Sequence, residues 1–123
     1  MIRLLTAIKT HWAALTLITL TAITLLSLWP LATLPSIPGT DKTHHLIAYA
    51  LLMLPVALRK PDKWIVLGLF FMAYSGAIEL IQPYVNRYGE WLDLLANITG
   101  LVLGALIAGL INFLAFTKPE NPN

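Results

Sequence analysis

The sequence predicts an all-α integral membrane protein, a bundle of four transmembrane helices with both termini in the cytoplasm. The composition indicates the class, because 58% of the 123 residues are hydrophobic and only 11% are charged, against about a quarter charged in an ordinary soluble domain. Four apolar runs of about 18 to 25 residues are each long enough for a bilayer core of ~30 Å. A soluble all-helical protein, the alternative, would need far more polar surface.

Charge and cysteine content exclude several function classes. The formal net charge of +2 and the lack of a basic stripe with interleaved aromatic residues argue against a nucleic-acid partner. Without cysteine, the chain can form no disulfide, thiolate nucleophile or cysteine-based metal site. The length leaves room for a single transmembrane domain over residues 1–123, for which we expect no cofactor.

The first span is expected at 12–29, after a short basic start that carries Arg3 and Lys9. A basic start and an apolar run also fit a signal peptide, but this run is long for one and no clean small-residue cleavage site follows it. Three prolines and a glycine then break any helix over 30–40, which is expected to be a loop.

The second and third spans are expected at 41–58 and 64–82. Pro55 removes one backbone hydrogen bond and should kink or end the second span. A tight charged turn at 59–63 links the two spans, and Pro83 stops the third.

The fourth span, the longest, is expected at 91–116. A polar connection at 83–90 with a turn at 86–89 leads into it, and a frayed polar tail at 118–123 follows it. Tryptophan side chains favour the headgroup level of a membrane. All the tryptophans fall at the expected span ends, at Trp12, Trp29, Trp64 and Trp91.

The distribution of basic residues sets the orientation. Most of them lie near the N-terminus, in the turn between the second and third spans, or in the tail, at Arg3, Lys9, Arg59, Lys60, Lys63 and Lys118. Only Lys42 and Arg87 lie on the other side. By the positive-inside rule both termini are cytoplasmic, so the loops at 30–40 and 83–90 face outward.

The second span begins with a polar stripe. At ~100° per residue, its members fall within about a quarter of the helix circumference: Asp41, Lys42, His45 and Tyr49. His44 lies off that face. A structural interpretation is open for the first two, because Asp41 would cap the helix N-terminus and Lys42 would extend to the headgroups. His45 and Tyr49 lie deeper, so this explanation does not cover them.

Two polar residues end the third span. Glu79 and Gln82 are three residues apart and share one face of the helix. An unpaired carboxylate is costly in a membrane, so we expect Glu79 to be protonated or to be matched by a cation or by hydrogen-bond donors, with Arg87 in the adjacent loop as the nearest candidate. The alternative is that this ion pair only holds the loop in place.

One face of the fourth span has polar residues at its start and small residues farther along. Asp93 and Asn97 are four residues apart, and Gly100, Gly104 and Ala108 continue the same face. Glycines four residues apart let another helix backbone come close. The face that packs deep in the membrane should therefore present Asp93 and Asn97 near the outer surface.

The three stripes predict a small, outward-facing polar pocket. Its ligand-binding side chains would be Lys42, His45, Tyr49, Glu79, Gln82, Arg87, Asp93 and Asn97. Its rim would be formed by Tyr84, Tyr88 and Trp91.

These residues resemble the pattern of the VanZ-like family. The first part, D-K-x-x-H-x-x-x-Y, stands at 41–49, and the second part stands at Glu79, Gln82, Arg87, Asp93, Asn97, Gly100 and Gly104. The match covers about half of the chain, and Asn86 departs from it where a small residue is expected. The resemblance implies a small multi-span protein of the bacterial cytoplasmic membrane. The founding member is associated with resistance to teicoplanin, a lipid-tailed glycopeptide, but the resemblance names no substrate.

The first functional hypothesis is a binding module. Lys42, His45 and Arg87 could hold an anionic lipid headgroup or a lipid-linked envelope intermediate, since the arginine fork suits phosphate. Such binding could alter the access of a glycopeptide to the cell surface.

The second hypothesis is a membrane hydrolase or transferase that acts on a lipid-linked substrate. His45 would be the general acid or base, while Lys42 and Arg87 would stabilise developing negative charge. Residues that could orient the imidazole, or share in catalysis, are Asp41, Glu79 and Asp93. No nucleophile is evident, because no base is adjacent in sequence to Ser27, Ser36 or Ser75.

Two further interpretations remain. A divalent metal could be held by Asp41, His45, Glu79 and Asp93, but their spacing matches no known metal motif, and no metal is expected. The third hypothesis is structural, with a polar cluster that orders the bundle or an oligomer interface without any ligand.

Overall fold

A computed structural model describes residues 1–30, 40–85, 87 and 89–117. All regular structure in these residues is helical, so the predicted all-α class is confirmed. The elements are α1 (Ile2–Thr10), α2 (Trp12–Leu28), α3 (Asp41–Arg59), α4 (Trp64–Ile81), the short 3₁₀ helix η2 (Gln82–Val85) and α5 (Trp91–Phe116). The expected tail at 118–123, most of the first loop, and Asn86 and Tyr88 in the expected turn lie outside the described residues.

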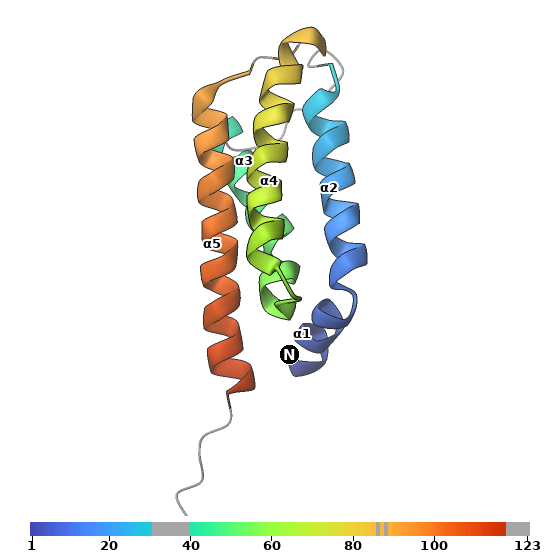
Figure 1. Cartoon of the computed structure of the whole chain (residues 1–123), viewed down its shortest axis with the longest axis vertical. Helices are drawn as coiled ribbons and strands as arrows, with labels where there is room; N and C mark the ends of the chain where they lie inside the picture. Colours follow the sequence, from blue (N-terminus) through green and yellow to red (C-terminus); the bar gives the residue numbers. More distant parts are fainter. Residues whose placement is uncertain (31–39, 86, 88, 118–123) are drawn as a thin grey trace, which may run out of the picture.

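The long helices run up and down beside one another (Figure 1). At one end α2 and α4 finish and α3 and α5 begin; we call this the polar end. The opposite end holds α1, the link between α3 and α4, and the end of α5. There the Lys9 Nζ atom lies 3.6 Å from the centre of the Phe116 ring, which joins the first and last helices.

Two helical segments are long and apolar enough to cross a membrane, Trp64–Val85 and Trp91–Phe116. A third is obtained if α1 and α2, which meet at 75°, form one broken span. α3 does not pass this test, because the charged and histidine residues of its first turns lower its hydropathy. Its 19 residues nevertheless extend over ~28 Å.

The outer faces of the long helices are apolar. On α5, Leu106, Phe113 and Leu114 are each more than half exposed. A monomeric soluble protein rarely exposes a broad apolar surface of this kind. The surface therefore agrees with the composition in indicating a membrane protein.

α3 is the central helix, since it contacts α1, α2, α4 and α5. Leu52, Val56 and Leu58 on this helix are at most 1% exposed. Pro55 does not end the helix, which continues to Arg59. The packing of neighbouring helices around this segment outweighs the one backbone hydrogen bond that proline removes.

The start of α3 differs from the prediction in one detail. Thr40, with an extended backbone, is the N-cap, and its Oγ1 atom accepts a hydrogen bond from the Thr43 amide at 3.2 Å. Asp41 therefore does not cap the helix. It lies in the first turn, where its charge still suits the helix dipole and its carboxylate can face other side chains.

α1 was not expected from the sequence, which indicated only a short basic start before the first span. Leu5 is buried, and Ile8 packs against the core. A nine-residue helix is marginal on its own. It forms because the ends of α2 and α3 cover its apolar side.

α3 and α5 pack with their backbones in close contact. A Cβ atom added to Gly104 would lie 2.5 Å from the carbonyl oxygen of Ala50, and one added to Gly100 would overlap the carbonyl oxygen of Leu46. Only glycine fits at these two positions. The close approach places the first turns of α3 and α5 side by side, which positions the polar residues described next.

Candidate functional site

The first turns of α3 and α5 are joined through Lys42. Its Nζ atom lies 2.5 Å from Asp93 Oδ1 and 2.6 Å from Glu90 Oε2. The Asp93 side chain is only 4% exposed, so this lysine compensates a buried carboxylate. Two carboxylates thus hold the Lys42 amine against α5. Glu90 was not among the sequence-predicted site residues.

We expect Lys42→Met to lower the midpoint of thermal unfolding in detergent, because the buried Asp93 carboxylate loses its cation. The double variant Lys42→Met/Asp93→Leu removes both charges and should recover most of the loss. A double variant no more stable than Lys42→Met would show that Lys42 does not compensate Asp93.

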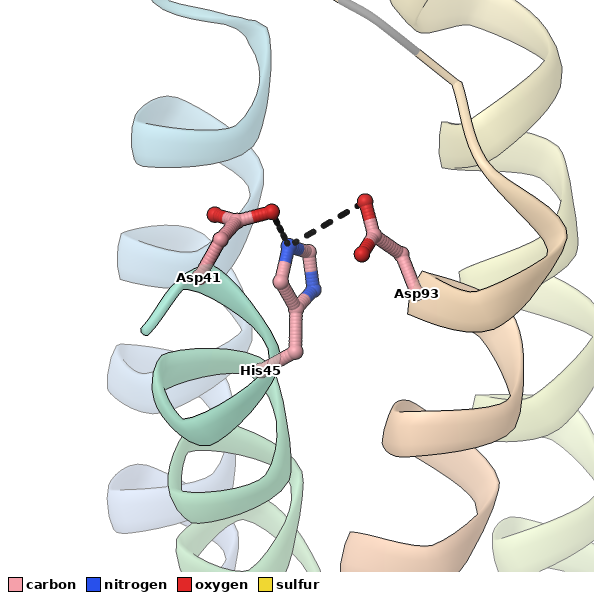
Figure 2. Close-up of side chains that lie close together, drawn as sticks. All are labelled: Asp41, His45 and Asp93. Carbon is pink, nitrogen blue, oxygen red and sulfur yellow. Dashed lines mark ion pairs between the residues drawn. The ribbon is translucent and has the colours of Figure 1, made fainter. Parts of the chain in front are cut away.

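His45 lies between two carboxylates, as Figure 2 shows. Its Nε2 atom is 3.7 Å from Asp41 Oδ2 and 3.8 Å from Asp93 Oδ2. Both separations exceed the ~3.2 Å limit of an ordinary N–H···O hydrogen bond. The three side chains, from the first two turns of α3 and the first turn of α5, thus face a common point without touching.

The other ring nitrogen of His45 is fixed by Asn97. The Asn97 Nδ2 atom donates to Ser75 Oγ at 2.8 Å, so its Oδ1 atom is directed at His45 Nδ1, 2.9 Å away. An amide oxygen can only accept. His45 Nδ1 therefore carries a proton, and in the neutral ring the lone pair is on Nε2, between the two carboxylates. Tyr49, 2% exposed, lies next to Ser75 and continues this polar row inward.

Two predicted site residues lie away from this centre and hold the end of α2. Gln82 Nε2 donates to the Ser27 carbonyl at 3.1 Å. Arg87 Nη1 donates to the carbonyls of Leu26 at 2.7 Å and Trp29 at 2.9 Å. The last carbonyls of a helix have no partner within it, and these side chains satisfy them.

Arg87, the nearest candidate partner of Glu79, does not pair with it, since the ion pairs of the described residues do not include this one. Glu79 Oε2 instead accepts a hydrogen bond from the Glu90 backbone amide at 3.1 Å. Its Oε1 atom is buried and has no hydrogen-bond partner within the described part of the chain. Arg87 bonds the end of α2 instead, and Glu79 bonds Glu90, the N-cap residue of α5.

Glu79 and Glu90 are the charged lining residues of a groove of about 540 Å³ between α4 and α5. Its other lining residues are mostly apolar or small: Ala73, Gly76, Ala77, Leu80, Pro83, Gly89, Trp91 and Leu94. Tyr84 and Trp91, expected at the rim, are 88% and 82% exposed at this end. Tyr88, the third expected rim residue, lies outside the described residues. The site thus combines a charged cluster with an apolar groove.

One group of side chains in the described segments has the make-up of a metal site. Asp41, His45 and Asp93 each offer a ligand atom, and these atoms lie within 4.8 Å of one another. Glu79, the fourth residue considered from the sequence, is not in this group. The sequence already groups Asp41, His45 and Asp93 with Glu79, and the structure brings the first three of them together.

Comparison with known proteins gives a family. The family model described as VanZ/LLP1 matches residues 2–112, nearly the whole chain, and the chain belongs to this family. No curated protein and no solved structure matched it significantly.

Proposed function

We propose that this member of the VanZ/LLP1 family is a multi-pass protein of the bacterial cytoplasmic membrane that binds the headgroup of a lipid or of a lipid-linked envelope intermediate at its polar end. The observation that carries the proposal is the groove between α4 and α5. Its lining is apolar or small except for Glu79 and Glu90, the second of which contacts Lys42. A ligand with a hydrocarbon chain and a polar head matches such a lining.

The topology in this proposal has α3 crossing the membrane together with α2, α4 and α5. α3 is largely buried over its second half, and on its first half Ile47 and Leu51 present apolar surface, at 50% and 54% exposure. Basic residues gather at the end opposite the polar end, at Arg3, Lys9, Arg59, Lys60 and Lys63. The positive-inside rule would place that end in the cytoplasm and the polar end outside. A protein holding lipid there could influence teicoplanin susceptibility.

Filling the groove tests lipid binding. Gly76 lines the groove, and a Cβ atom added there would meet nothing within 4 Å. The change Gly76→Leu should therefore occupy the groove at little cost in packing. We expect lipid retained through purification, measured by mass spectrometry, to fall several-fold in this variant.

Gly109→Leu is the matched control. Gly109 also has open space at its Cβ position, but it lies on α5 and is not among the groove residues. It should retain as much lipid as the unsubstituted protein. Equal lipid retention in all three proteins would refute binding in the groove.

A second candidate, a hydrolase or transferase, is favoured by the orientation of His45. Asn97 holds its Nδ1 proton, so Nε2 can accept a proton from water or a substrate hydroxyl. Ser75 is fully buried and its Oγ atom accepts from Asn97, which makes it a poor nucleophile. The attacking group would then be water. Under this alternative, His45→Gln should leave a folded, lipid-retaining protein that no longer influences teicoplanin susceptibility.

A further inference from the structure

We propose that Asp41, His45 and Asp93 form a binding site for a divalent transition metal ion, with Zn²⁺ as the ion that suits it best. The site lies at the polar end, on the first turns of α3 and α5 (Figure 2). Imidazole nitrogen and carboxylate oxygen are ligands that zinc takes in proteins, and three protein ligands with one open position are typical of its non-structural sites.

The spacing of the ligand atoms fits an ion better than direct contact. His45 Nε2 lies 3.7 Å from Asp41 Oδ2 and 3.8 Å from Asp93 Oδ2. A tetrahedral ion with bonds of ~2.1 Å separates its ligand atoms by ~3.4 Å. A shift of a few tenths of an ångström would bring His45 Nε2 to that separation from each aspartate, and the two aspartate oxygens, which lie within 4.8 Å of each other, would approach further around the ion.

His45 is prepared for coordination through the ring nitrogen that faces the two aspartates. Its Nδ1 proton is held by Asn97 Oδ1, and Asn97 is itself held by Ser75. In metal sites the second ring nitrogen of a ligating histidine usually donates to such a partner, which fixes the tautomer and the ring orientation. The buried Asn97 and Ser75, both at most 1% exposed, form a rigid support of this kind.

Asp93 is also oriented. Lys42 contacts its Oδ1 atom, while the Oδ2 atom is the one that faces His45. The lysine therefore holds the carboxylate in place without taking the oxygen that would bind the ion. Asp41, whose side chain is 63% exposed, leaves the site open toward the surface.

The charge balance favours a cation. Asp41, Glu79, Glu90 and Asp93 supply carboxylates near the site. Lys42 contacts two of these carboxylates, Glu90 and Asp93, whereas Arg87 is bonded to the end of α2. An anionic phosphate would meet net negative charge there. A bound Zn²⁺ would offset that charge and offer its open position to a phosphate oxygen; this last step rests on the proposed function.

Direct metal binding tests the site. The full chain in detergent is titrated with Zn²⁺ by calorimetry and with Co²⁺ by visible absorption, with Mg²⁺ as the comparison ion. We expect one Zn²⁺ per chain, weaker Mg²⁺ binding because imidazole suits transition ions, and at least ~10-fold weaker Zn²⁺ binding in His45→Gln and Asp41→Asn. His44→Gln is the matched control, since this neighbouring histidine is not in the ligand group, and it should bind as the unsubstituted protein does.

The outcomes separate this site from the lipid proposal. Asp41 is exposed, so Asp41→Asn should fold even if His45→Gln does not. No Zn²⁺ uptake by the unsubstituted protein, or equal affinity in Asp41→Asn and His44→Gln, would overturn the metal site. If Gly76→Leu still binds zinc and retains as much lipid as the unsubstituted protein, the metal site is supported and lipid binding in the groove is refuted. Zinc-dependent retention of a phosphate-monoester lipid such as phosphatidic acid, lost with a chelator, supports both.

Discussion

Gly104→Leu is expected to separate α3 from α5 and to lower the free energy of unfolding by about 3 kcal/mol. The new side chain would begin 2.5 Å from the Ala50 carbonyl oxygen, in contact with backbone that cannot rotate away. The two helices must therefore move apart over much of their length. The loss can be measured as a lower midpoint of thermal unfolding in detergent, followed by tryptophan fluorescence.

Gly109→Leu serves as the control for helix propensity and lipid contact. It lies on the same helix, and no atom lies within 4 Å of its Cβ position. Its stability should stay within about 0.5 kcal/mol of the unsubstituted protein. If both glycine variants lose the same stability, the close approach of α3 and α5 is not what Gly104 provides.

Gly104→Leu should also disrupt the polar contacts between the first turns of α3 and α5. Lys42 and His45 are on α3, whereas Asp93 and Asn97 are on α5, so every contact between them depends on how closely these helices approach. Stability and the proposed zinc binding should fall together in Gly104→Leu. The packing glycines and the site residues are thus parts of one arrangement.

Local geometry explains what the sequence could predict. Helical periodicity placed Asp93 and Asn97 on one face with Gly100 and Gly104, and all four are buried. Hydropathy placed the third and fourth spans within a few residues of α4 and α5. Both patterns depend on neighbours within a few turns, and a single sequence records such neighbours directly.

The choice of partners between helices could not be predicted in the same way. Arg87 is the nearest candidate cation for Glu79, eight residues away, yet it donates to the carbonyls of Leu26 and Trp29 across ~60 positions. Lys42 likewise meets Glu90, which the polar stripes did not include. Several carboxylates and two cations lie at the same depth, and only the packing of the helices decides which of them meet.

Asn97→Ala is expected to lower the free energy of unfolding by about 2 kcal/mol, because it leaves two buried partners unsatisfied. His45 Nδ1 would lose its acceptor, and Ser75 Oγ would lose its donor. Asn97 is 1% exposed, so water cannot easily replace it. The same change should weaken zinc binding by about 10- to 100-fold, since the imidazole is no longer oriented. Thermal unfolding and zinc calorimetry measure the two effects.

Asn112→Ala separates orientation from general destabilisation. This asparagine is on the same helix, and its Nδ2 atom donates at 3.1 Å to the carbonyl of Leu58, which lies near the opposite end of α3 from His45. Its loss should cost about 1 kcal/mol of stability and leave the zinc affinity unchanged. Asn97→Asp keeps an acceptor for His45, so it should retain more zinc affinity than Asn97→Ala. If Asn97→Ala and Asn112→Ala differ only in stability and bind zinc equally, Asn97 is a structural residue and His45 is not held for a metal.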